Sequence, residues 1–385
     1  MKIRIIIAAC LLIVAAYVNA QNTSELMLES DQKLTIGGYA QIDYNQPFSS
    51  DTRSNGTLDV HRVVLMFGYR FNEKTQFITE VEYEHVQEVY IEQAFLNYKI
   101  NDWLNFRGGL LLIPMGIINE YHEPATYNGV ERPNLDGQIV PTTWREIGAG
   151  FTGRVQNLNM RYQLYVVNGF KSYDGSGILR GSDGFRRGRQ KGAESIMSHP
   201  NLSAKVDYYG LPGLKLGLSG YFGETQSTLY NGLPKDDALL EARADSSVVG
   251  LNMLGLDAAY SVKGLVLRGQ MIYASINNTG QYNKFTGKDL GSEMFGYYLE
   301  AGYDVLSSGK SEQKLIPFVR YEKYNTHAKT ENLVKNLAYD RSDITAGLGW
   351  WMTPGAVLKA DLQWFENEAT DTNKKQLNLG IGIWF

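Results

Sequence analysis

The 385-residue chain has a single cysteine, only ten prolines and no long apolar run beyond its first twenty residues. The cysteine, Cys10, lies within those twenty residues, so the rest of the chain has no thiol. An exported protein without disulfides needs another large source of stability, and a closed, fully hydrogen-bonded sheet supplies one. A transmembrane helix needs about 18 consecutive apolar residues, which the rest of the sequence lacks.

Residues 1–20 have the parts of a secretory signal peptide. Lys2 and Arg4 precede an apolar run over residues 5–18, and we expect cleavage after Ala20. The alternative, an N-terminal membrane anchor, requires an apolar run of about 20 residues. Removal of the leader leaves 35 basic and 41 acidic residues, a net charge of −6. With this charge and no basic face, no nucleic acid is expected as a partner.

The last twelve residues, 374–385, alternate between two faces. Every second residue from Leu377 to Phe385 is apolar, and the intervening residues are polar, glycine or Trp384. This period of two is typical of a strand, and residues 34–45 show it at the other end of the chain. Pairing of the two segments would close a sheet into a tube, as a membrane requires because open edges leave N–H and C=O groups unsatisfied. Phe385 resembles the aromatic end of outer-membrane barrels of Gram-negative bacteria.

Sixteen strand-like segments follow a polar lead at residues 21–33, which we interpret as periplasmic. Short turns rich in Asn, Asp, Gly and Pro alternate with mostly longer loops. This asymmetry is typical of outer-membrane barrels, so we predict an all-β fold, a 16-stranded antiparallel transmembrane β-barrel over residues 34–385 with short periplasmic turns and long extracellular loops. The predicted strands are residues 34–45, 58–71, 74–85, 89–100, 103–113, 146–155, 159–167, 201–209, 213–223, 248–261, 263–275, 293–304, 313–324, 342–352, 355–367 and 374–385.

Charged residues occupy alternate positions in these strands, and aromatic residues gather near the strand ends. A soluble all-β protein, the alternative, would place its aromatic residues mid-strand, whereas rings near strand ends fit interfacial girdles. Asn252 and Asp257 fall on opposite parities of one strand, which predicts a bulge or a shifted strand end there. Because sixteen strands enclose more space than their side chains fill, we expect a water-filled lumen. Its predicted lining residues are Arg62, Glu80, Glu82, Glu84, Arg107, Arg154, Arg161, Lys205, Asp207, Arg268, Arg320 and Glu322.

Residues 114–145 form the third long connection and are rich in proline, apolar and aromatic residues. Such residues suit a loop that folds inward and packs on the barrel wall, so we expect this loop to narrow the pore. A surface loop with solvated charges is the alternative. The candidate constriction residues are Glu120, Glu123, Glu131, Arg132, Asp136 and Arg145.

Residues 168–200 carry a net charge of +3. At a channel mouth this charge could attract anions or carboxylated sugars. The alternative is a mobile loop that binds lipopolysaccharide phosphates or nothing. The basic residues of this predicted extracellular loop are Lys171, Arg180, Arg186, Arg187, Arg189 and Lys191.

Three central blocks resemble the phosphate-selective porin O and P family, particularly its Bacteroidetes versions. They are RGGLLLIPMGIINE (107–120), ERP (131–133) and REIGAGFTGRV (145–155). The resemblance implies a sixteen-stranded outer-membrane porin, usually a homotrimer, with its third loop folded into the pore. In phosphate-specific members of the family, inward arginines lead to a lysine cluster. Residues 114–145 depart from that pattern, because they contain no lysine and their four acids outnumber two arginines.

Signals for catalysis are weak. Residues 148–153 match GxGxxG but lie in a predicted strand and open no helix, and the histidines show no metal spacing. We therefore predict no enzyme, cofactor, catalytic residue or metal site. The sequence predicts an outer-membrane porin for passive diffusion of small hydrophilic solutes, with outer-membrane lipid around it and a possible bias toward phosphate or other small anions. The alternatives are a plugged barrel acting in adhesion or assembly, supported by the long loops, and a barrel enzyme.

Overall fold

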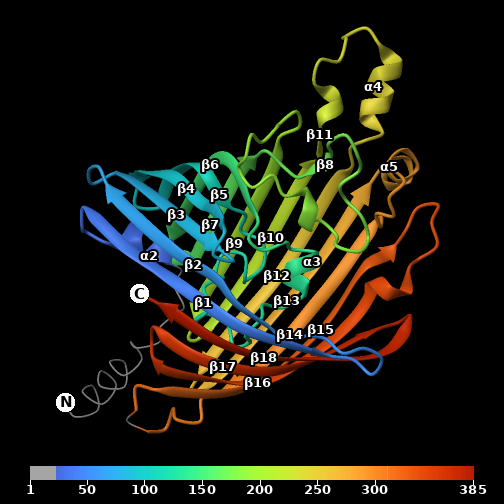
Figure 1. The fold of residues 1–385 in the computed structure, drawn as a ribbon. Helices are drawn as coiled ribbons and strands as arrows, with labels where there is room; N and C mark the ends of the chain where they lie inside the picture. Colours follow the sequence, from blue (N-terminus) through green and yellow to red (C-terminus); the bar gives the residue numbers. More distant parts are fainter. Residues whose placement is uncertain (1–22, 310) are drawn as a thin grey trace.

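The computed structural model describes residues 23–309 and 311–385, in which sixteen strands form one closed antiparallel barrel (Figure 1). The predicted fold is thereby confirmed, while the signal peptide lies outside the described residues. The barrel strands are β1 (Leu34–Phe48), β2 (Thr57–Arg70), β3 (Thr75–Glu84), β4 (Glu88–Asn101), β5 (Leu104–Leu112), β6 (Arg145–Val155), β7 (Met160–Val167), β9 (Asn201–Leu211), β10 (Leu214–Glu224), β12 (Gly250–Val262), β13 (Leu265–Asn277), β14 (Glu293–Tyr303), β15 (Lys314–Lys329), β16 (Asp340–Thr353), β17 (Ala356–Asn367) and β18 (Thr370–Trp384).

The two ends of the chain form the seam of the barrel. β1 pairs with β18 from Tyr39 opposite Trp384 to Phe48 opposite Lys375. Gly38 and Phe385 exchange two backbone hydrogen bonds, of 2.8 and 2.9 Å. The predicted closure between the first and last strands is therefore confirmed, and no edge strand remains unpaired in the barrel.

Alternation along each strand separates an apolar outer face from the interior. In β12, Leu254 and Leu256 are about half exposed (50% and 49%), whereas Met253 and Asp257 are buried. β12 pairs without a register shift with both neighbours, so it has no bulge, and of the two predicted alternatives the shifted end remains, since the strand begins at Gly250 rather than at residue 248. Asn252 is exposed on the outer face at the third residue of β12. It lies near the extracellular rim, where a polar side chain reaches water.

The longer connections carry the remaining elements. The constriction loop, residues 114–145, enters the barrel, and the connection between β10 and β12 rises as an arm beyond the barrel rim (Figure 1). None of the helices in the described part of the chain is long and apolar enough to cross a membrane. The remaining elements are α3 (Leu135–Gln138), α4 (Ala238–Asp245), α5 (Thr279–Thr286), β8 (Lys171–Tyr173), β11 (Gln226–Ser227), η1 (Gln156–Leu158), η2 (Arg186–Gly188), η3 (Thr228–Tyr230) and η4 (Leu337–Tyr339).

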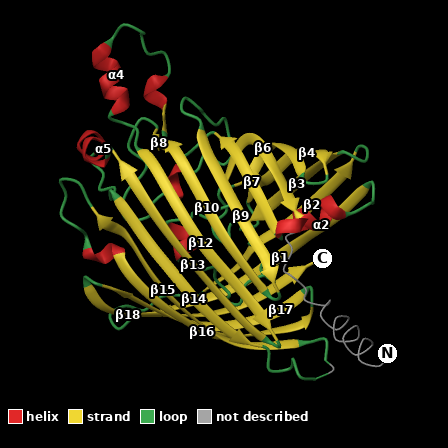
Figure 2. Ribbon diagram, turned by 180° about the vertical axis from the view of Figure 1, so that it is seen from behind, coloured by secondary structure: helices red, strands yellow, loops and turns green. Residues whose placement is uncertain are grey.

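The polar lead contains a helix, α2 (Thr23–Glu29), that the sequence did not predict. It lies at the periplasmic end of the barrel, near the C-terminus (Figure 2). Ser24 accepts a hydrogen bond from the inward side chain of Gln93, and Thr23 accepts one from Trp384. Seven residues carry too little periodicity to reveal a helix, and tertiary contacts of this kind stabilise it instead.

An apolar core lies inside the barrel, where the sequence analysis predicted water. Met115, Leu135 and Trp144 of the constriction loop are fully buried, and they belong to one cluster with inward wall residues such as Met253 and Ile272. The lumen therefore holds an apolar core of loop and wall side chains beside the space open to water. Loops, rather than wall side chains alone, fill much of the space that the sixteen strands enclose.

A cation on the outer face tests the assignment of that face. We expect Leu256→Arg to lower the free energy of unfolding in lipid bilayers by about 2–4 kcal/mol, because a charge near the middle of the hydrocarbon layer is costly. Leu239→Arg is the control, since Leu239 is 85% exposed on α4 and lies outside the barrel wall. Equal effects of the two substitutions in guanidinium titrations would contradict the assignment.

Candidate functional site

A cavity of about 530 Å³ lies at the extracellular end of the lumen. We call it the vestibule. Its walls come from the extracellular ends of β2, β3, β4, β17 and β18, from the constriction loop and from the basic loop, residues 168–200. The charged residues and histidines that line the vestibule are His61, Arg62, Glu82, Glu84, His85, Glu88, Glu131, Arg132, Asp136, Arg145, Arg186, Arg189 and Lys191.

Lys359 of β17 fastens the constriction loop to the wall. Its Nζ donates hydrogen bonds to the backbone oxygens of Pro124 (2.5 Å), Tyr127 (2.6 Å) and Gly129 (2.8 Å). It also lies 4.1 Å from the centroid of the Tyr127 ring. A buried irregular loop must find partners for its backbone groups, and this one ammonium group satisfies three of them.

Other inward charges also bind the backbone of the constriction loop. Lys205 donates to the Gly116 oxygen at 2.5 Å, and Glu322 accepts from the Leu135 nitrogen at 3.2 Å. Arg320 donates to the Glu131 oxygen at 3.4 Å. These three residues, predicted to line the lumen, are buried beneath the loop and hold it in place.

The remaining predicted lining residues divide by depth. Arg62, Glu82 and Glu84 line the vestibule, although Arg62 and Glu82 are largely buried, whereas Glu80 is buried away from it. At the periplasmic end, Arg161 bridges Glu25 of α2 and Glu120. The ion pairs of the other predicted residues join Arg154 to Glu25 (3.2 Å) and Glu29 (2.8 Å), Asp207 to Arg161 (3.6 Å), and Arg268 to Glu300 (3.9 Å).

The constriction candidates separate into two groups. Glu131, Arg132, Asp136 and Arg145 border the vestibule. Glu120 and Glu123 are buried away from it. Glu120 accepts from Arg161 (2.6 Å), Gln163 (2.7 Å) and Lys205 (3.1 Å), and Glu123 accepts from the Thr23 nitrogen (3.1 Å).

The basic loop also divides. Lys171 pairs with Asp174 at 2.8 Å, while Arg180 and Arg187 pair with Asp183 at 2.8 and 2.7 Å. In contrast, Arg186, Arg189 and Lys191 border the vestibule. These three form no ion pair with any described residue: the two arginines donate to backbone oxygens, and Lys191 lies 4.5 Å from the centroid of the Tyr90 ring.

Burial shifts the pKa values of several loop groups that border the vestibule. Burial raises the pKa of Asp136 to about 8, so this carboxyl group is mainly protonated at neutral pH. Burial and the like charges of Arg189 and Arg145 lower the pKa of Lys191 from its usual value. Burial and the neighbouring Asp43 also raise the pKa of Glu131. The raised pKa values of the two carboxyl groups reduce negative charge on the constriction loop, whereas the lowered pKa of Lys191 reduces positive charge on the basic loop.

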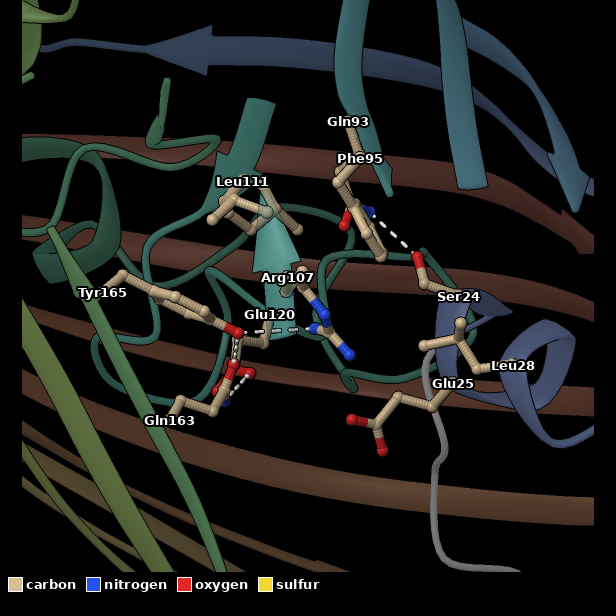
Figure 3. A pocket seen from close by; sticks show the side chains of 11 residues that line it. Ser24, Glu25, Leu28, Gln93, Phe95, Arg107, Leu111, Glu120, Gln163 and Tyr165 are labelled. Carbon is tan, nitrogen blue, oxygen red and sulfur yellow. Dashed lines mark hydrogen bonds between the residues drawn. The ribbon is translucent and has the colours of Figure 1, made fainter. Parts of the chain in front are cut away.

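A second, much smaller cavity of about 20 Å³ separates α2 from the barrel wall. Figure 3 shows Ser24, Glu25 and Leu28 on its helix side, with Arg107 and Tyr165 opposite. A space of this size holds about one water molecule. It is a packing gap beneath the helix and leaves no room for a solute.

Sequence reasoning missed Glu92 and His122. The register of β3 with β4 shifts after Glu80, so that Glu92 and Gln93, adjacent in sequence, are both buried. The only available signal was the adjacent polar pair between Ile91 and Ala94, and a period of two assigns such a pair to opposite faces. His122 belongs to the constriction loop, and its side chain is buried inside the barrel.

We expect Lys359→Met to loosen the constriction loop, because three buried backbone oxygens lose their donor and each unsatisfied acceptor costs about 1–3 kcal/mol. Hydrogen–deuterium exchange should accelerate at least tenfold in residues 123–131. Lys323→Met is the control, since Lys323 is partly exposed and pairs with Asp340 and Glu368. Unchanged exchange in residues 123–131 would show that Lys359 does not fasten the loop.

We expect Glu120→Gln to destabilise the barrel by about 3 kcal/mol at pH 7, because it removes the buried partner of Lys205 and Arg161. Burial disfavours the Glu120 carboxylate, but those two cations outweigh it and hold the Glu120 pKa well below its usual value. This contribution is present above the unfolded-state pKa and is lost as pH falls. Guanidinium unfolding should therefore show a smaller difference from wild type at pH 3 than at pH 7.

Glu29→Gln is the matched control, since Glu29 pairs with Arg154 at the surface. It should cost less than about 1 kcal/mol. A Glu120→Gln protein as stable as the control at pH 7 would contradict the role given to the buried carboxylate.

Comparison with known proteins agrees with the barrel. No protein-family model matches the chain. A protein of Aquifex aeolicus (strain VF5), described as uncharacterized, is 29% identical over 347 residues, which cover 85% of this chain and 74% of that protein.

Solved structures of similar fold include the outer membrane channel DcaP of Acinetobacter baumannii, at 11% identity and a TM-score of 0.60 over 91% of this chain and 97% of that chain. OmpF of Salmonella typhi has 13% identity and a TM-score of 0.58 over 91% and 97%. An anion-selective porin from Comamonas acidovorans has 13% identity and a TM-score of 0.54 over 91% and 99%. The chain therefore has the fold of outer-membrane porins, while the resemblance to the phosphate-selective family is not confirmed.

Proposed function

We propose that the protein is a channel of the bacterial outer membrane for passive diffusion of small hydrophilic solutes, with a bias toward small anions. The vestibule carries this proposal. It is large enough for a small solute, and it is bordered by Arg186, Arg189 and Lys191, whose positive charges have no carboxylate partner among the described residues. A cleft with one sign of charge raises the local concentration of oppositely charged solutes.

In this proposal the constriction loop sets the narrowest part of the path. Arg132 and Arg145 face the vestibule from the loop, opposite Glu82 and Glu84 of the wall. Solutes thus meet a transverse field, and the raised pKa of Asp136 removes one negative charge from the loop at neutral pH. Phosphate is one anion that fits such a site, although no lysine lies within the loop. A homotrimer in outer-membrane lipid is the assembly that the family resemblance implies.

A plugged barrel acting in adhesion or assembly is the second candidate. Two observations favour it: α2 and the loops fill much of the lumen, and the arm with α4 projects beyond the rim (Figure 1). Leu239 and Leu240 on this arm are exposed apolar residues that a partner could cover. Recording from single molecules in planar bilayers separates the candidates, because only the channel gives stepwise conductance.

We expect Lys191→Glu to lower the anion/cation permeability ratio at least twofold, because it reverses a charge beside the vestibule. Reversal potentials in asymmetric KCl measure this ratio. Arg187→Glu is the control, since Arg187 pairs with Asp183 and is 61% exposed in its side chain. Arg132→Ala and Arg145→Ala should change conductance as well as ion preference. If neither does so, the constriction assignment is wrong.

The anion preference should also fall between pH 7 and pH 9. Asp136 gains negative charge as pH rises through its pKa of about 8. Lys191 has a lowered pKa and loses positive charge as pH rises. Reversal potentials at both pH values test this expectation. Asp136→Asn should reduce the pH effect, and an anion preference that rises with pH would contradict the assigned charges.

A further inference from the structure

One histidine and two glutamates meet in a buried cluster outside the vestibule. Glu80 of β3, Glu92 of β4 and His122 of the constriction loop each place a ligand atom within 4.8 Å of the others, and all three residues are buried. His122 Nε2 lies 3.1 Å from Glu92 Oε2 and 3.5 Å from Glu80 Oε1. Ligands at about 2.1 Å from a tetrahedral metal lie about 3.4 Å apart, so these spacings fit a shared ion.

Each of the three residues uses its other polar atom to bind an outer partner. One atom per residue is thereby anchored, and the remaining atom faces the centre of the cluster. This is the arrangement by which proteins orient metal ligands, with a second contact fixing each imidazole or carboxylate. The outer contacts are His122 Nδ1 to Asn119 O (3.2 Å), Glu80 Oε2 to Gln93 Nε2 (2.6 Å), and Glu92 Oε1 to Thr143 Oγ1 and to an Arg145 guanidinium nitrogen (3.4 Å).

The backbone of β4 is adapted to this cluster. The register shift that follows Glu80 turns Glu92 and Gln93 inward together, so that one becomes a ligand and the other supports Glu80. Regular alternation would direct one of the two toward lipid. Bulges that re-aim a side chain in this way are over-represented beside functional sites.

We propose that Glu80, Glu92 and His122 bind one divalent transition-metal ion. One imidazole and two carboxylates form a ligand set suited to Zn²⁺. The Tyr39 hydroxyl group lies 2.9 Å from Glu80 Oε1 and 3.4 Å from Glu92 Oε2, beside the fourth position. Because His122 belongs to the constriction loop and the glutamates to the wall, the ion fixes the loop to the barrel at a further point, distinct from the contacts of Lys359, Lys205 and Glu322.

The experiment uses the full-length mature protein folded in detergent. The protein is stripped with EDTA, incubated with ZnCl₂, passed through a desalting column and analysed for metal by mass spectrometry. We expect one equivalent of zinc per chain, and an unfolding midpoint that rises on zinc addition. His122→Gln and Glu92→Gln should each lose the zinc and the shift, with folding of each variant verified by circular dichroism and heat-modifiable gel migration.

Two controls separate this site from other histidines. His199→Ala removes a surface histidine 3.6 Å from Glu224, and His61→Ala with His85→Ala removes the vestibule pair whose rings lie 5.5 Å apart. Both controls should retain the zinc. Absence of zinc from the wild-type protein would overturn the proposal and leave a protonated His122 as the counter-charge. Loss of zinc in a control, with retention in His122→Gln and Glu92→Gln, would overturn it as well.

Discussion

The structure depends on a barrel wall without a free edge. Every strand in the hydrocarbon layer must give its backbone hydrogen bonds to a neighbour, and the pairing of β1 with β18 supplies the last of them. A closed wall of sixteen strands then encloses more space than its own side chains can fill. The constriction loop and α2 fill much of that space. The backbone N–H and C=O groups of the irregular loop therefore also need hydrogen-bond partners away from bulk water.

Inward-facing charged side chains supply hydrogen-bond partners for the backbone of the loop. Lys359, Lys205 and Glu322 use their charged atoms on loop backbone groups, and other charges pair with one another beneath the loop. Charges of this kind make a buried loop rigid, because each missing hydrogen bond would leave a buried polar group unsatisfied at a cost in folding free energy. The cations that border the vestibule without a carboxylate partner among the described residues come mainly from the basic loop. In the proposed channel, holding the loop and attracting a solute are therefore carried by different residues at different depths.

The sequence was sufficient to predict the strands of the barrel wall, but not the structure of the loop and helix inside it. Alternation in segments such as 374–385 is a local property, and lipid outside enforces it, so strand number, order and closure were predictable. The directions of Glu80, Lys205 and Arg320 followed from the same period. Their partners did not, because Gly116 or Glu131 meets the wall only through a fold of the loop that no local pattern encodes. Glu92 was missed since a bulge breaks the period, and α2 because seven residues show none.

The seam has a consequence for assembly. β1 and β18 are separated by the whole length of the barrel sequence, so their contact has the highest cost in chain entropy and is expected to form late. α2 precedes β1 and touches Trp384 through Thr23, while Thr23 also binds Glu123 of the loop. The helix can dock fully only when the last strand and the inner loop are both in position. Its docking thus marks a completed cylinder, and an unfinished one leaves its periplasmic mouth uncapped.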